Sequence, residues 1–82
     1  MDKYPKVEVE WLDAQSSFGL ALPIEELINV KLTTTYSTGY LLHEDKEKII
    51  LGFMLFGEDM VKHDQIIPKG MIKKITKLRV IK

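Results

Sequence analysis

Two pairs of neighbouring carboxylates are the first residues of this chain that could perform chemistry. They are Glu44–Asp45 and Glu58–Asp59. Catalysis by carboxylates needs two acids in one dry cleft with separated pKa values. Adjacent residues on a strand point to opposite faces of the sheet, and adjacent acids in a turn are usually solvated. Both pairs are therefore interpreted as turn residues.

Hydroxyl and imidazole side chains supply the residue types of a hydrolytic triad, in Asp13, Ser16, Ser17 and His43. A triad is defined by its geometry, and the sequence contains no Gly-x-Ser-x-Gly nucleophile elbow. The acid and the two serines are better explained as turn caps. The chain has no cysteine, and His43 and His63 show no metal-ligand spacing. We expect no enzymatic activity, no metal and no cofactor.

Length and composition indicate a small globular protein. The 82 residues leave room for one domain, residues 1–82, with one core. A domain of this size is marginally stable, and without disulfides or metals self-association is a common source of extra stability. The 12 basic and 12 acidic side chains balance to zero net charge, which argues against general nucleic-acid binding.

Hydropathy gives no sign of a membrane protein. No stretch approaches the ~20 apolar residues that span a bilayer. Residues Met1–Lys6 contain no apolar run of signal-peptide length. We therefore expect a cytoplasmic protein with no membrane partner.

Most of the chain has the pattern of short strands. Val7–Trp11 alternates apolar and acidic residues, so that Val7, Val9 and Trp11 would point inward. Further strands are expected at Val30–Tyr36, Gly39–His43, Ile49–Phe56 and Gln65–Ile67. A charged hairpin turn is expected at Glu44–Lys48, and a polar loop begins at Gly57. One helical turn is expected at Ile24–Ile28, with Pro23 in its first position. Gly52 could mark a sharp bend.

The end of the chain has two interpretations. A single 3₁₀ turn after Pro68, followed by a strand over Ile75–Ile81, accounts for the β-branched residues there. A basic amphipathic helix from Lys69 onward accounts for the spacing of Ile72, Ile75 and Leu78. The turn and strand are favoured. The fold class predicted is then all-β, a small SH3-like or Sm-like barrel of five or six strands.

Three stretches resemble small, uncharacterised proteins of bacteriophages and prophages. They are Val9–Ser16, Ser37–Asp45 and Ile66–Ile75. Together they cover about a third of the chain, in the order and spacing expected for that family. The family implies a phage origin and carries no function that can be transferred.

A second resemblance is to the Sm-like fold of RNA processing. Gly39, Leu41 and Asp45 are similar to the first Sm motif, and Lys69-Gly70 before Ile72 is similar to the second, one residue short. The family places a base-reading Asn near the position of Ile49. The resemblance therefore supports the barrel more than it supports RNA binding.

Aromatic and basic residues provide one candidate binding surface. Trp11 could stack on a ligand, but an inward position on an alternating strand favours the core. Tyr36 and Tyr40 are the more credible exposed aromatics, and base stacking on such a ring contributes about 1–3 kcal/mol. The basic cluster near the end of the chain could contact phosphates, or could protect an edge strand from unwanted pairing. It consists of Lys69, Lys73, Lys74 and Lys77. The candidate contacts for single-stranded RNA or DNA, or for a nucleotide, are Tyr36, Tyr40, Lys69, Lys73 and Lys74.

The strand Ile49–Phe56 provides the other candidate surface, because it is apolar on both faces. Acids dominate residues 1–30 and bases dominate residues 66–82, which could attract a neighbouring subunit or could offset one another within the chain. The leading hypothesis is a non-enzymatic, phage-derived binding or assembly module that acts as a homo-oligomer through Met54, Leu55 and Phe56. The alternatives are a single-stranded nucleic-acid or nucleotide binder and an inhibitor of a host protein.

Overall fold

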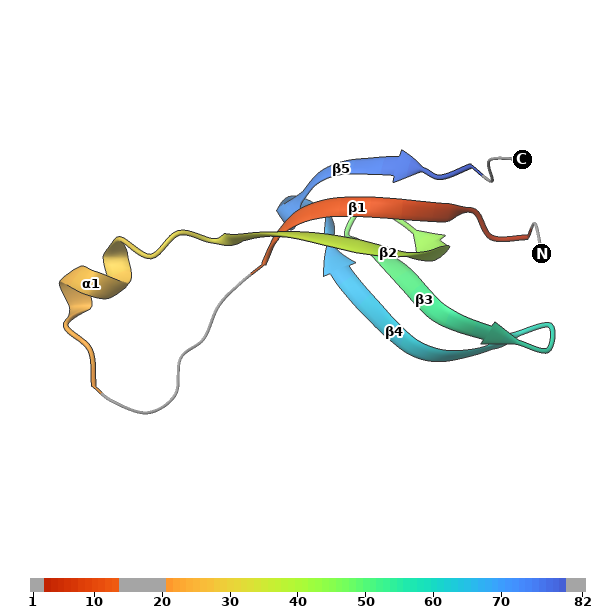
Figure 1. Cartoon of the computed structure of the whole chain (residues 1–82), viewed down its shortest axis with the longest axis horizontal. Coiled ribbons are helices and arrows are strands. Elements are labelled where there is room, and N and C mark those ends of the chain that lie inside the picture. Colours follow the sequence, from red (N-terminus) through yellow and green to blue (C-terminus); the bar gives the residue numbers. More distant parts are fainter. Residues whose placement is uncertain (1–2, 14–20, 80–82) are drawn as a thin grey trace.

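A single antiparallel sheet of five strands forms the body of the protein (Figure 1). The computed structural model describes residues 3–13 and 21–79. The strands are β1 (Lys6–Asp13), β2 (Thr33–Glu44), β3 (Lys48–Phe56), β4 (Met60–Pro68) and β5 (Ile72–Lys77), with a short helix α1 (Ile24–Ile28) and a 3₁₀ turn at Lys69–Met71. The predicted all-β class is confirmed. Among the described residues, no helix has the length and hydropathy to cross a membrane.

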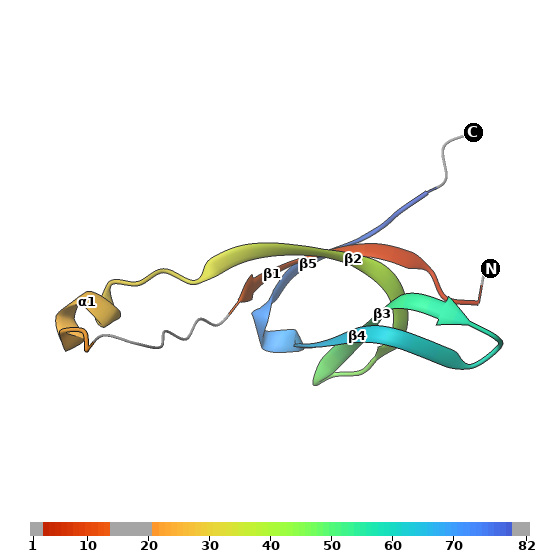
Figure 2. The ribbon, with the colours of Figure 1, turned by 60° about the horizontal axis from the view of Figure 1, so that its bottom comes forward.

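The strand order is β4-β3-β2-β1-β5. The first four strands follow one another as a meander, and the 3₁₀ turn carries the chain across to β5, which pairs with β1. β2 is shared between two halves of the sheet, because residues 33–40 pair with β1 and residues 40–44 pair with β3. The sheet curls around this long strand (Figure 2). A 3₁₀ turn before a last strand is the layout that the sequence predicts.

Several element boundaries differ from the sequence-based expectation. The two strands expected at Val30–Tyr36 and Gly39–His43 are one continuous strand, β2. β4 begins at Met60, so the expected polar loop is reduced to a turn at residues 57–59. β5 begins at Ile72, which rules out the rival helix there, and residues 80–82 lie outside the described residues. Pairing with a neighbouring strand joins the two halves of β2 and extends β4 and the start of β5, and local composition does not report that pairing. The expected ranges were too long elsewhere, because β2 begins only at Thr33 and β5 ends at Lys77.

The core lies between the two halves of the curled sheet. As predicted, Val7, Val9 and Trp11 point inward, and they meet three buried side chains of β3 and β4: Ile49, Leu51 and Ile67. Trp11 is only 7% exposed, and its Nε1 donates a hydrogen bond of 3.0 Å to Oγ of Ser37, which is itself buried. Trp11 is thus a core residue. No buried side-chain polar atom lacks a partner within the part of the chain that the structure describes.

Gly52 leaves room on β3 for one side chain from each of the two neighbouring strands. A Cβ atom there would stand 2.8 Å from both Leu42 Cδ1 and Val61 Cγ2. Pairing between β2 and β3 stops at Gly52, while pairing between β3 and β4 continues to Phe56. The last residues of β3 and the first of β4 therefore form a hairpin end with no β2 partner.

Candidate functional site

The segment of residues 21–32, which we call the α1 arm, leaves all of its side chains exposed. It runs away from the sheet at one end of the molecule (Figure 1). Its six large aliphatic residues are between 45% and 75% exposed, namely Leu22, Ile24, Leu27, Ile28, Val30 and Leu32. Exposed aliphatic residues gathered in one segment make that segment a candidate interaction site.

The arm is not needed to connect β1 with β2. Asp13 and Thr33 are register partners at the ends of these two strands, and a hairpin loop of about 2–5 residues would join them. Residues 14–32 stand in that place instead. Long connections of this kind are usually functional, so the arm is a candidate for binding. Ser16 and Ser17, the hydroxyls of the triad considered above, lie outside the described residues.

Helix α1 is an amphipathic single turn. Ile24, Leu27 and Ile28 have the i, i+3, i+4 spacing that places them on one face, while Glu25 and Glu26 lie on the other. No side chain caps the N-terminus of the helix, and none of its residues is buried. At the C-terminus, Asn29 Nδ2 donates a hydrogen bond of 3.1 Å to the carbonyl oxygen of Glu25. An isolated helix of five residues is unstable in water. Packing of its apolar face against another surface would supply the missing stability.

A hollow with an apolar floor lies at the other candidate surface, the hairpin end of β3 and β4. Its volume is about 70 Å³, and part of it is open to solvent. Its walls are Tyr4, Leu42, Leu55, Val61 and residues Gly57–Met60. Of the three residues predicted at an interface, Leu55 lines this hollow. Met54 and Phe56 lie outside its lining, and each is about half exposed.

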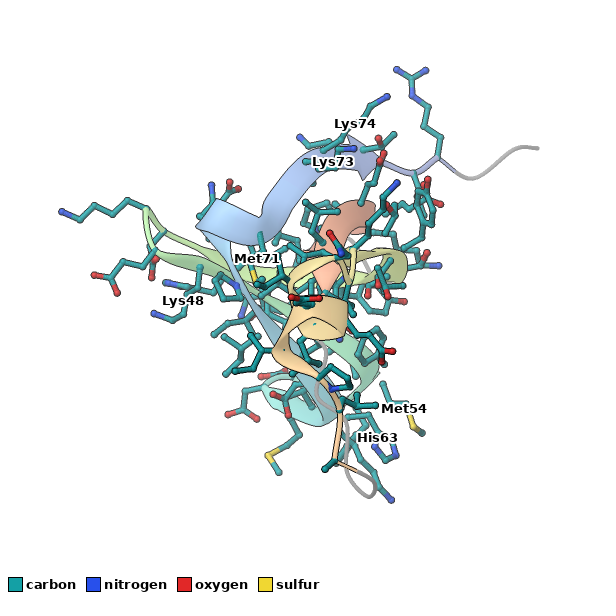
Figure 3. The ribbon with its side chains drawn as sticks, turned by 90° about the vertical axis from the view of Figure 1, so that its left-hand side faces the viewer. Lys48, Met54, His63, Met71, Lys73 and Lys74 are labelled. Carbon is teal, nitrogen blue, oxygen red and sulfur yellow. The ribbon has the colours of Figure 1, made fainter. Side chains whose placement is uncertain are left out.

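The remaining candidates are divided between two places on the sheet. Tyr36 lies opposite Glu10, and Glu10 lies opposite Lys74, so these three side chains share one face of β2, β1 and β5. Tyr40 lies four residues further along the same face of β2, with the Lys6 ammonium 5.5 Å from its ring centroid. Figure 3 shows Lys73 and Lys74 at one side of the molecule and Met54 with His63 at the opposite side.

Carboxylates accompany the basic residues of that face. Lys73 Nζ is 3.7 Å from a carboxylate oxygen of Glu10. Lys69 lies apart, on the 3₁₀ turn, where its ammonium pairs with Glu44 of β2. The structure therefore brings Tyr36, Tyr40, Lys73 and Lys74 together and leaves Lys69 elsewhere. A base of β5 and an acid of β1 thus offset one another within the chain, and an attraction of the two charged ends for a neighbour stays a prediction.

Asp45 has a structural role in the turn between β2 and β3. Its Oδ1 accepts hydrogen bonds from the backbone N–H groups of Glu47 and Lys48, and its Oδ2 lies 2.8 Å from His43 Nε2 and 3.1 Å from Lys48 Nζ. The His43 contact, followed by these donors, holds the pKa of Asp45 well below its usual range. The structure thus explains this carboxylate as the closure of a hairpin turn.

No metal centre can be built from the side chains of residues 3–13 and 21–79, where no group of three or more His, Cys, Asp or Glu is suitably placed. Comparisons with protein-family models, with curated proteins and with solved structures find no match to this chain. The functional inference therefore depends on the two apolar surfaces. The sequence predicted Leu55 at an interface, which stays a prediction, and did not predict the arm, although six large aliphatic residues between two paired strands were a usable signal.

Proposed function

We propose that this protein is a non-enzymatic assembly module that acts by binding further copies of itself. The observation that carries the proposal is the pair of unsatisfied apolar surfaces, the α1 arm and the hairpin end, on a chain with a small core. Six buried hydrophobic residues form that core, whereas six of comparable size are exposed on the arm alone.

The free energy that burial of the arm would contribute is a sizeable fraction of the stability of a small domain. Burial of one exposed Ile or Leu side chain contributes about 1.5–3 kcal/mol. Ile24 and Ile28 are 75% and 74% exposed, so these two residues alone would contribute a few kcal/mol. The free energy of unfolding of a typical domain is about 5–15 kcal/mol. Association through these surfaces would therefore stabilise the protein appreciably.

Sedimentation over a range of concentrations tests the proposal. We expect the average mass to rise with concentration between about 1 μM and 1 mM, a range that corresponds to association free energies of about −8 to −4 kcal/mol. Phe56→Lys should lower the average mass. Ile66→Lys is the matched control, because Ile66 is an exposed residue of β4 at the end remote from the hairpin turn. A monomeric mass throughout the range would refute self-association.

A second candidate function, binding of single-stranded nucleic acid, is favoured by the face that carries Tyr36, Tyr40 and Lys74. Tyr36 is 62% exposed, which leaves its ring free to stack on a base. Glu8 and Glu10 on the central strand of the same face oppose phosphate binding. For this reason self-association remains the leading proposal.

Fluorescence anisotropy of labelled single-stranded RNA and DNA tests this second candidate. Binding should weaken steeply as salt is added, because counterions are released from phosphates. Tyr36→Ala should weaken it by about 5- to 150-fold, the equivalent of one lost stacking contact of 1–3 kcal/mol. Ile66→Ala, on the other half of the sheet, is the control. An unchanged anisotropy at low salt would exclude nucleic-acid binding by this face.

A further inference from the structure

The two apolar surfaces are at opposite ends of the molecule. The structure measures 50 × 28 × 23 Å along its principal axes. Helix α1 lies at one end of the long axis, and the turn between β3 and β4 lies at the other, in both ribbon views (Figures 1 and 2). The arm as it stands therefore does not reach the hollow of its own chain, and each surface is left for another molecule.

We propose that the α1 arm of one copy docks into the hairpin-end hollow of a second copy, with the face formed by Ile24, Leu27 and Ile28 against the apolar floor. This inference rests on the proposed self-association and names its two contact surfaces. The two surfaces suit one another in form, because an amphipathic helix with apolar residues at i, i+3 and i+4 is the element that binds in an apolar groove. The apolar residues that line the hollow include Leu42, Leu55 and Val61.

Stability supplies a second reason for this pairing. The arm buries none of its side chains, and no side chain caps the N-terminus of its helix, so packing against another surface would stabilise it. The second copy brings both surfaces at once, and every copy that lends an arm also offers a hollow. One type of contact therefore satisfies both apolar surfaces, whether two copies exchange arms or several follow one another in a ring.

Charge decides how the docked arm is oriented. Glu58 and Asp59 stand on the wall of the hollow, so the acids of the arm must point away from it. Glu25 and Glu26 do so when the opposite face of α1 is buried. The contact is then apolar, and added salt should leave it unchanged or tighten it by screening the remaining acids. Nucleic-acid binding would show the reverse dependence on salt.

Disulfide trapping tests which surfaces meet, and the absence of native cysteine makes the trap clean. Ile28→Cys and Met60→Cys place single thiols on the arm and on the wall of the hollow, both at exposed positions. Mixed and mildly oxidised, the two variants should form a disulfide-linked heterodimer, whereas each variant alone should give little linked product. Ile28→Cys mixed with Lys74→Cys is the control, because Lys74 lies on neither surface.

The outcomes separate this inference from the broader proposal. If the wild-type chain associates but Ile28→Cys links mainly to itself, arms pair with arms; the arm-to-hollow contact is then wrong while self-association stands. If the wild-type chain stays monomeric and no mixture forms disulfides, both proposals fail, and the arm must serve a different protein.

Complementation of two defective variants gives an independent readout. Ile24→Asp places a charge on the apolar face of the arm and leaves the hollow unchanged. Met60→Asp places a charge on the wall of the hollow and leaves the arm unchanged. Each alone should raise the dissociation constant at least ~30-fold, the loss expected of a central contact, with an unchanged circular dichroism spectrum. Together they should form a one-to-one dimer that does not grow. A mixture that remains monomeric under conditions where the wild type associates would overturn the arm-to-hollow contact.

Discussion

The α1 arm and strand β1 contain similar aliphatic side chains and use them in opposite ways. Val7 and Val9 of β1 are fully buried, whereas Val30 of the arm is 54% exposed. β1 lies in the sheet between β2 and β5, so strands on both sides hold its backbone while β3 and β4 cover its apolar face. The arm has no strand beside it. Burial within the chain thus depends on neighbours, and the same residue type stabilises the fold in one region and is left for association in the other.

The contrast makes a general expectation about substitutions. Changes in β1 should lower the free energy of unfolding of the single chain, and changes in the arm should alter association while the single chain unfolds as before. Four substitutions, ordered by the size of their effect on stability, test this separation.

Trp11→Ala should have the largest effect. The substitution removes the largest core side chain and leaves the buried Ser37 hydroxyl without the indole donor. Large aromatic residues cost about 3–5 kcal/mol when truncated in a core, which is most of the stability of a small domain. Urea unfolding should be followed by circular dichroism, because Trp11 is the only tryptophan. A loss below about 1 kcal/mol would show that the core does not depend on this residue.

Val9→Thr should have the next largest effect. The two side chains have nearly the same shape, so the substitution adds a hydroxyl group to a fully buried site without opening a cavity. An unsatisfied hydroxyl costs about 1–3 kcal/mol in protein cores. The midpoint of urea unfolding should fall with an unchanged dependence on urea concentration.

Asp45→Asn should have a smaller effect that depends on pH. The remaining Oδ1 can still accept the backbone N–H groups of Glu47 and Lys48, so the change removes mainly the charge. Because folding lowers the pKa of Asp45, its carboxylate contributes stability above the ordinary carboxyl pKa of about 3.9 and loses that contribution as the pH falls further.

Thermal unfolding at several pH values measures this dependence. The wild type should unfold at a higher temperature than Asp45→Asn near neutral pH, and the difference should disappear in strong acid. It should stay smaller than either core effect, because exposed ion pairs contribute little. A difference that grows as the pH falls would contradict the assigned hydrogen bonds.

Val30→Thr is the matched counterpart of Val9→Thr and should have the smallest effect. The free energy of unfolding should change by no more than about 0.5 kcal/mol, as for most surface substitutions. The measurement is urea unfolding at a concentration where the wild type is monomeric. A loss as large as that of Val9→Thr would mean that the arm packs on its own chain, and the contrast with β1 would not hold.

Prediction from the sequence was most successful where the signal is local. The alternation of Val7, Val9 and Trp11 predicted a half-buried strand, and Pro68 with the β-branched residues behind it predicted a 3₁₀ turn followed by a strand. It was weaker where pairing decides the outcome. The extension of β4 back to Met60 depends on Phe56, Leu55 and Met54 opposite it, and no pattern within residues 60–64 reports these partners.

The candidate surfaces divide in the same manner. Leu55 was predicted from the apolar strand alone, and the tyrosines of β2 and the lysines of β5 were predicted by residue type; their roles in binding stay predictions. The sequence did not predict their grouping. Tyr36 and Lys74 lie on either side of Glu10 only because of the register in which β2 and β5 pair with β1. The same holds for Lys69, which the fold pairs with Glu44.

The sequence by itself determined a small all-β protein with an inward Trp11, a charged hairpin turn and no cysteine chemistry. These features follow from residue type and from periods of two or three residues, which act over short stretches of chain. Only the tertiary structure decided that β1 pairs with β2 while the α1 arm lies outside the sheet, and that the α1 arm and the hairpin-end hollow lie at opposite ends of the molecule. Those facts depend on contacts between residues far apart in the chain, and such contacts exist only once the sheet has formed.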